Sequence, residues 1–219
     1  MRITISKENY LKSIAEAESE GEVVKAATLV RWLNVSAPAV TMAIKRLKRD
    51  ALIHVGNEGQ LTLTDAGREI ANRLLQRHHL IERMLTEIFG MEWYKVHDEA
   101  EQLEHAVSAD FERRLIEKLG PAQACPHGNQ VERDTPKDRR DRGLQPLSEL
   151  AASQAAHVVS VFERDRKLLE YLNGLGIFPG AALETVSRNY DETLTLRIGG
   201  KPVQLGAGAA EKVWVERVA

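Results

Sequence analysis

The sequence predicts a mainly α-helical fold with additional β structure. Near the N-terminus, three short helical patterns precede two strand-like runs; two longer helical patterns fill the middle, and the last third is rich in strand-like sequence. A length of 219 residues suits one to three small domains. We therefore expect three domains, with boundaries at 1–75, 76–143 and 144–219.

The composition is that of an ordinary soluble globular protein, with 43% hydrophobic and 28% charged residues. No apolar run is long enough to span a membrane and no signal-peptide core is present, so we expect a cytoplasmic protein without a membrane partner. The single cysteine, Cys125, excludes an internal disulfide. The formal charge is +2 over residues 1–75 and −4 over the remainder, which weakly favours a nucleic-acid-binding N-terminal domain.

The order of elements in the first 75 residues indicates a known DNA-binding architecture. Ser6 is expected to cap the first helix, a second helix fits 25–33, and Ser36 caps a third. The strand-like runs 52–55 and 60–64 are joined by Gly-Asn-Glu-Gly, which suits a tight hairpin turn. Helix, helix–turn–helix and hairpin together predict a winged helix-turn-helix.

In such a fold the third helix presents its N-terminal residues to the major groove of DNA. The residues expected to face the bases or their backbone are Ser36, Ala37, Pro38, Ala39, Thr41 and Met42, and those expected to contact phosphates are Arg46, Lys48 and Arg49. The reading surface is small and mostly apolar, so shape and phosphate contacts should carry much of the affinity. The alternative is a winged helix used for protein interaction.

Two long helices are predicted in the middle of the chain. The first begins at the cap Thr64 and continues to Phe89–Gly90; the second runs from Trp93 or Asp98 to about Glu117. Two helices cannot enclose a core alone, so their apolar stripes predict a homodimer. The alternative is that these stripes pack only within the chain.

Residues 78–105 contain four of the seven histidines, among several carboxylates. If the second helix is continuous, four side chains share one face at i, i+4, i+7 and i+8: His97, Glu101, Glu104 and His105. His78 and Glu82 are also one helical turn apart. Imidazole with carboxylate suits Mn, Fe, Zn or Co better than Ca or Mg. The alternative is a solvated polar face.

Six segments occur in order with characteristic spacing: ENYLKSI (8–14), SAPAVT (36–41), KRLKRDALI (45–53), LTDAG (63–67), RHHLIERML (77–85) and KVHDEA…LEH (95–105). On these segments, residues 1–120 resemble the diphtheria toxin repressor and manganese transport regulator family of metal-dependent repressors.

The resemblance implies a primary metal site formed by Asn9, His78, Glu101, Glu104 and His105. Manganese-type members have a carboxylate where iron-type members have sulfur, so Glu101 favours Mn²⁺, with Fe²⁺ and Zn²⁺ as alternatives. Relatives usually have Met or Asp at the position of Asn9. An amide oxygen carries no charge, so Asn9 should bind metal more weakly or use its backbone carbonyl.

Cys125 and His127 lie two residues apart in a loop and could reach one ligand; the alternative is an inert thiol and a loop histidine. The string CPHGN is similar to the three-domain, manganese-type branch, and this resemblance implies a secondary site that adds Glu82 and an acid from the third domain. Asp165 is the first choice for that acid and Glu163 the rival, and His97 is an alternative ligand. A thiolate would also accept Zn or Fe.

Residues 132–143 have the mixed charge of a polar, mobile linker. After it we expect a strand at 158–162, a helix at 165–174 capped by Asp165, and a hairpin formed by LTLRIGG and KPVQLG. This part resembles the SH3-like, FeoA-like β-barrel that many family members carry at their C-terminus, where it modulates repression and lends a metal ligand.

The resemblance implies a manganese-activated homodimeric repressor that binds palindromic operator DNA and controls metal-homeostasis genes such as those of metal transport. Metal would link the first helix to the dimerisation helices and so set the spacing of the winged helices near one DNA turn or a multiple of it. We expect no enzyme activity and no organic cofactor. The alternatives are an iron-dependent regulator, a metallohydrolase using the His/Glu cluster, and a metal-independent regulator of an organic ligand.

Overall fold

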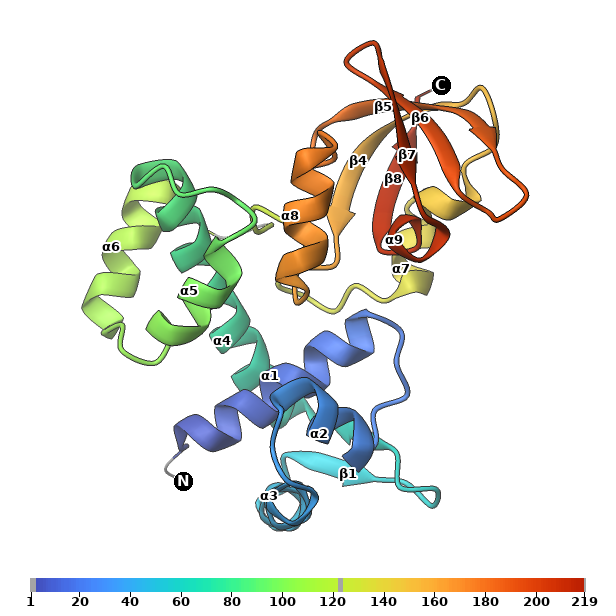
Figure 1. Cartoon of the computed structure of the whole chain (residues 1–219). Helices are drawn as coiled ribbons and strands as arrows, with labels where there is room; N and C mark the ends of the chain where they lie inside the picture. Colours follow the sequence, from blue (N-terminus) through green and yellow to red (C-terminus); the bar gives the residue numbers. More distant parts are fainter. Residues whose placement is uncertain (1–2, 122–123, 219) are drawn as a thin grey trace. The chain divides into compact units, whose positions relative to one another are not determined.

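The computed structural model describes residues 3–121 and 124–218, which form two compact units (Figure 1). The first unit comprises the described residues of Met1–Leu80, Leu103–Ala122 and Val131–Pro136. The second comprises Ile81–Gln102 and the described residues of Gln123–Gln130 and Lys137–Ala219. Among the described residues, none of the helices combines the length and the apolar character that crossing a bilayer would need.

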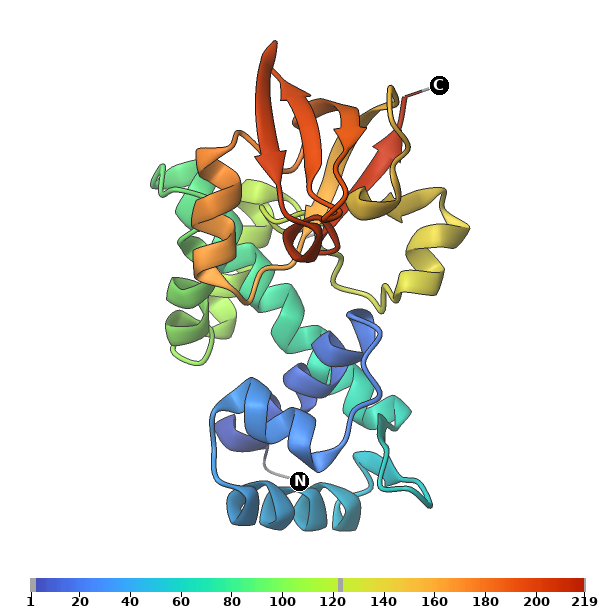
Figure 2. The same cartoon turned by 45° about the vertical axis from the view of Figure 1, so that its right-hand side comes forward.

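The first unit begins with a winged helix-turn-helix, as predicted (Figure 2). Its elements are α1 (Ile5–Ser19), α2 (Ala26–Leu33), α3 (Ala37–Arg49), β1 (Ile53–Val55) and β2 (Leu61–Leu63), with the two strands paired antiparallel. Ser36 caps α3 by accepting a hydrogen bond from the Ala39 N–H at 3.4 Å. The expected cap of α1 was wrong: Thr4 has the extended backbone and accepts from the Lys7 N–H, while Ser6 lies inside the helix.

Helix α1 is the centre of this unit, because it is buried all round between Tyr10 and Ala17. Its apolar side chains share a core with those of α2, α3 and the hairpin, including Leu11, Ile14, Leu29, Leu47 and Leu52. Polar side chains of the same helix are buried too, among them Lys12 and Glu16. Burying a charged side chain is costly unless it is paired, so these positions point to a polar site beside the helix.

The middle of the chain is more broken than the sequence predicted. Helix α4 (Asp65–Arg83) begins after Thr64, whose hydroxyl accepts from the Gly67 N–H, and continues into a π-helical turn, Met84–Ile88. The predicted second helix is wrong as one element, because it divides into α5 (Val96–Leu103) and α6 (Ala109–Leu119). Ser108 starts α6 as its N-cap, so Glu104 and His105 lie in the turn between the helices and not on a continuous helical face.

The second unit contains a six-stranded antiparallel sheet in the order β3-β8-β4-β5-β6-β7. The strands are β3 (Leu144–Pro146), β4 (Ala155–Val161), β5 (Ala182–Arg188), β6 (Leu194–Ile198), β7 (Lys201–Leu205) and β8 (Val213–Arg217). The helices beside them are α7 (Pro136–Asp141), a 3₁₀ turn (Leu147–Glu149), α8 (Arg166–Gly174) and α9 (Ala207–Ala210). The core joins α8 to the sheet through Leu169 and Leu172.

Three expectations for this unit can be compared with the structure. Asp165 caps α8, as predicted. The hairpin of LTLRIGG and KPVQLG is present as β6 and β7. The segment 132–143 is not a linker without regular structure, because it contains α7, whose Arg139 is buried with its guanidinium 5.1 Å from the centre of the Trp214 ring.

Candidate metal centres

The first cluster lies in the first unit and consists of Asn9, Lys12, His78, Glu104 and His105. Helix α1 supplies the first two, α4 supplies His78, and the turn after α5 supplies the last two. Glu104 is at the centre: its Oε2 lies 2.7 Å from His78 Nδ1, and its Oε1 lies 3.5 Å from His105 Nε2. The Asn9 Oδ1 is 2.6 Å from the same His105 nitrogen.

Lys12 donates a hydrogen bond to Glu104 Oε2 at 2.8 Å and lies 3.0 Å from His78 Nδ1. All three side chains are almost fully buried. Burial by itself raises the pKa of Glu104, but the hydrogen bond from His78 and the positive charge of Lys12 outweigh it and lower that pKa to about 2. Glu104 is therefore a carboxylate at neutral pH and available as a ligand.

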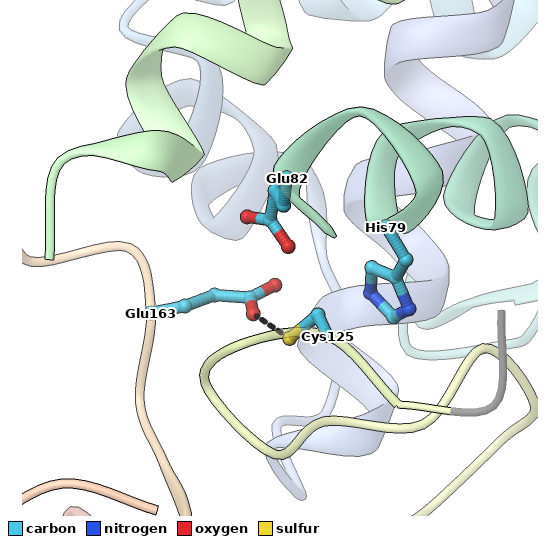
Figure 3. Close-up of side chains that lie close together, drawn as sticks. All are labelled: His79, Glu82, Cys125 and Glu163. Carbon is cyan, nitrogen blue, oxygen red and sulfur yellow. Dashed lines mark hydrogen bonds between the residues drawn. The ribbon is translucent and has the colours of Figure 1, made fainter. Parts of the chain in front are cut away.

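The second cluster lies in the second unit and consists of Glu82, His97, Cys125, His127 and Glu163. One carboxylate oxygen each of Glu82 and Glu163 and the Cys125 sulfur all lie within 4.8 Å of one another. His127 Nδ1 is 3.5 Å from an oxygen of each carboxylate, and His97 Nδ1 is 3.3 Å from Glu82. Figure 3 shows the side chains of Glu82, Cys125 and Glu163 close to one another.

In the second cluster, the neighbouring charges raise a pKa and favour the protonated form of the ligand. Burial raises the pKa of the Cys125 thiol well above its usual value, and the neighbouring charges of Glu163 and Glu82 raise it further. A divalent cation would reverse this effect, because a metal-bound thiol loses its proton. Sulfur, imidazole and carboxylate donors together suit a transition metal such as Zn, Fe or Mn. The residues of both clusters thus fit a metal ion chemically.

The CPHGN loop is shaped so that both of its ligand candidates face the same point. Cys125 Sγ and His127 Nδ1 are 3.6 Å apart, and the Gly128 N–H donates to the Cys125 carbonyl. Gly128 has a φ of +83°, and a Cβ there would lie 1.9 Å from the carbonyl oxygen of Val159. Only glycine fits this turn without displacing β4.

The structure brings most of the predicted ligands into these two groups. Asn9, His78, Glu104 and His105 meet in the first cluster, and Glu82, His97, Cys125 and His127 meet in the second. Glu101 belongs to the second unit, where it is exposed and lies 3.7 Å from His97 Nε2 and 3.3 Å from Arg164.

The acid of the third domain that joins the second cluster is the rival, Glu163. Its Oε2 accepts hydrogen bonds from the Cys125 thiol at 3.2 Å and from the Asn129 amide at 2.7 Å. The carboxylate of Asp165 instead accepts from the Leu168 N–H at the start of α8. Lys12 and Asn129 were missed by sequence reasoning. The signal for Lys12 was a charged residue one helical turn after Asn9, within the apolar stripe of α1.

The predicted DNA-reading surface is exposed on α3. All nine residues are accessible to solvent: Ser36, Ala37, Pro38, Ala39, Thr41, Met42, Arg46, Lys48 and Arg49. Val40, Ala43 and Leu47 occupy the opposite, buried face of the same helix. Helix α3 therefore holds its small N-terminal residues and its basic C-terminal half outward, as recognition of a DNA groove requires.

Three family profiles match consecutive parts of the chain. They are the N-terminal DNA-binding domain of iron-dependent repressors (residues 2–61), their metal-binding and dimerisation domain (64–132), and the FeoA domain (145–217). The diphtheria toxin repressor of Corynebacterium glutamicum is 32% identical, and the match covers 96% of both chains. The chain belongs to the iron-dependent repressor family. Iron-dependent repressor IdeR of Mycobacterium tuberculosis shows the same identity and coverage.

Solved structures of this family extend the comparison to the whole fold. A manganese-dependent transcriptional repressor in complex with manganese aligns with a TM-score of 0.85 at 31% identity, covering 97% of this chain and all of that one. ScaR with bound Zn²⁺ aligns with a TM-score of 0.79 at 28% identity, covering 97% and 99%. These matches confirm the predicted family and the predicted fold class, from winged helix to FeoA-type β domain. The protein is thus a member of a family of metal-dependent transcriptional repressors with a role in metal homeostasis.

Proposed function

We propose that this repressor is a homodimer activated by Mn²⁺ that binds palindromic operator DNA. The observation that carries the proposal is the first cluster, in which donors from α1, α4 and the turn after α5 converge on Glu104. Asn9, Glu104 and His105 would hold the ion. A bound Mn²⁺ would link α1 to the turn after α5 through these donors.

The first cluster is well placed to influence DNA binding. Helix α1 carries Asn9 and also packs against α3, so the position of the reading helix depends on how α1 is held. Ligands that favour one position of α1 shift the population of DNA-competent molecules, which is what allosteric coupling requires. The carboxylate and amide oxygens of this cluster suit Mn²⁺ by ligand type and geometry, and not by raw affinity.

The second cluster is proposed as a supporting site formed by Glu82, Cys125, His127 and Glu163, with His97 beside it. Its thiol would also accept Fe²⁺ or Zn²⁺, and this keeps an iron-dependent regulator as the second candidate function. Self-association is supported by α6, on which the apolar Phe111 is 45% exposed. A dimer would present two α3 helices to the two halves of a palindrome.

The proposal is tested by selecting duplexes from a random DNA library in the presence of MnCl₂. Binding of a selected duplex is then measured by fluorescence anisotropy in Mn²⁺, Fe²⁺ under anaerobic conditions, Zn²⁺ and a chelator, with bound metal counted per protomer. We expect an inverted repeat and a loss of affinity of roughly 5- to 150-fold on chelation. Metal-independent binding of the selected duplex would overturn the proposal, and stronger activation by Fe²⁺ would favour the iron-dependent regulator.

A further inference from the structure

The two carboxylate oxygens of Glu104 face different groups. Oε2 is held by Lys12 Nζ and His78 Nδ1, at 2.8 and 2.7 Å. Oε1 lies 3.5 Å from His105 Nε2, the nitrogen that is next to the Asn9 side-chain oxygen. The carboxylate therefore divides the first cluster into an Oε2 side, with Lys12 and His78, and an Oε1 side, with Asn9 and His105.

The Oε2 side already contains a positive charge. Lys12 is 3% exposed, and its ammonium lies 3.0 Å from the imidazole nitrogen of His78. A second carboxylate, that of Glu16, is 3.9 Å from the same ammonium. The Lys12 ammonium thus sits among two carboxylates and an imidazole, which are the donor types that a divalent transition metal would use.

We propose that Lys12 is a resident cation of the first cluster, which prevents Glu104 Oε2 and His78 from binding a divalent ion and leaves a single ion position on the Oε1 side. This inference rests on the proposed function of the first cluster as a metal site. On this assignment His78 is a positioning residue that orients Glu104, and Asn9 and His105 are ligands.

Two physical consequences follow from a fixed ammonium in this place. With His78, it holds the Oε2 end of the Glu104 carboxylate in the protein without metal, and His78 still anchors this carboxylate when the ammonium is removed. It also repels an ion bound on the other side of the same carboxylate, and repulsion between cations is strong in a buried site. Lys12 therefore limits both the number of ions and the affinity of the first cluster.

The experiment compares Lys12→Met, which keeps the aliphatic stem, and Lys12→Arg, which keeps the charge, with the wild type. Bound Mn²⁺ per protomer and its affinity are measured by equilibrium dialysis with elemental analysis, and folding is checked by circular dichroism. Lys7→Met is the matched control, because Lys7 is also on α1 but pairs with Asp50 at 2.7 Å. Glu104→Gln, alone and combined with Lys12→Met, shows which ions belong to the first cluster.

We expect Lys12→Met to bind an additional Mn²⁺ per protomer. It should also bind the first ion roughly tenfold more tightly, because a repelling charge beside it has been removed. Lys12→Arg and Lys7→Met should keep the wild-type number and affinity, and Glu104→Gln should abolish the gain. If Lys12→Met does not fold, Lys12→Gln takes its place. A folded neutral variant with unchanged or weaker Mn²⁺ binding overturns the inference. If Glu104→Gln leaves the ion count of the wild type unchanged, the failure lies in the proposed metal site itself.

Discussion

The two clusters hold similar ligand types but reach opposite electrostatic states. In the first, Lys12 and His78 lower the pKa of Glu104 to about 2, so the carboxylate keeps its charge although it is buried. In the second, burial and the charges of Glu163 and Glu82 raise the pKa of Cys125, so the thiol keeps its proton. The difference between them lies in the neighbouring groups: His78 and Lys12 lie beside Glu104, whereas two carboxylates lie beside Cys125.

If both clusters bind metal as proposed, they would do so from different starting states. The first cluster is neutralised by the chain itself, and an entering ion meets ligands that are already charged and oriented. The second cluster gathers two carboxylates around a thiol, and an entering ion changes the protonation of its own ligand. The first should therefore act as the switch for DNA binding, and the second should depend on metal for its stability.

The largest effect expected is from Glu104→Gln, which tests whether the first cluster is the switch. Removing this proposed ligand should reduce the DNA affinity measured with Mn²⁺ by about 100-fold. This lies near the upper end of the roughly 5- to 150-fold effects that are typical of allosteric coupling. It also leaves Lys12 buried without its main partner, which should cost about 3–5 kcal/mol of unfolding free energy. Anisotropy with the selected duplex and urea unfolding measure the two effects.

Glu163→Gln is the matched comparison, because it neutralises a buried carboxylate of the second cluster. This variant should retain most of the Mn²⁺ response and show a smaller change in unfolding free energy without metal. If Glu163→Gln abolishes the response while Glu104→Gln preserves it, the roles assigned to the two clusters are reversed.

A smaller effect is expected from Gly128→Ala, which tests how far the second cluster depends on the shape of its loop. The added Cβ would collide with the Val159 carbonyl, and the positive φ adds strain of about 1–3 kcal/mol. We expect metal affinity at the second cluster to fall by roughly tenfold or more, because mutations of residues that support metal ligands typically have effects of this size. Metal titration of the variant, followed by calorimetry, measures this change.

Gly143→Ala is the control for this variant, since Gly143 has a similar φ of +86° but no atom within 4 Å of an added Cβ. It should cost stability through backbone strain and leave metal affinity unchanged. Equal losses of metal affinity in the two variants would show that backbone strain, and not the shape of the CPHGN loop, causes the effect.

Much of this arrangement could be predicted from the sequence, because caps and periodicity are local signals. Ser36, Thr64 and Asp165 each cap a helix where the pattern placed one. The fold class followed from the order of these elements. The sequence also grouped Glu104 and His105 at one predicted site, on the assumption of a continuous helix. That assumption was wrong, and the turn before Ser108 instead brings both side chains to α1 and α4.

What the sequence could not provide were contacts that depend on packing between distant segments. Lys12 and Glu104 are 92 residues apart, and neither position shows by itself that the two will be buried together. Glu163 and Asp165 are equivalent acids in sequence terms. Only the start of α8 decides between them, because the helix cap occupies Asp165 and leaves Glu163 to face Cys125.

The smallest expected effect is a difference in the number of protons released when metal binds. It tests the contrast between the two clusters most directly. Because the pKa of Cys125 is raised, its thiol is protonated at pH 7 without metal, and metal binding to the thiolate must release that proton. Glu104, with its pKa near 2, is already ionised and releases none. Zn²⁺ titrations by calorimetry in phosphate and Tris buffers should therefore show about one more proton released per protomer by the wild type than by Cys125→Ser. Equal proton release would mean that Cys125 remains a thiol beside the ion, and the second cluster would then bind metal through imidazole and carboxylate alone.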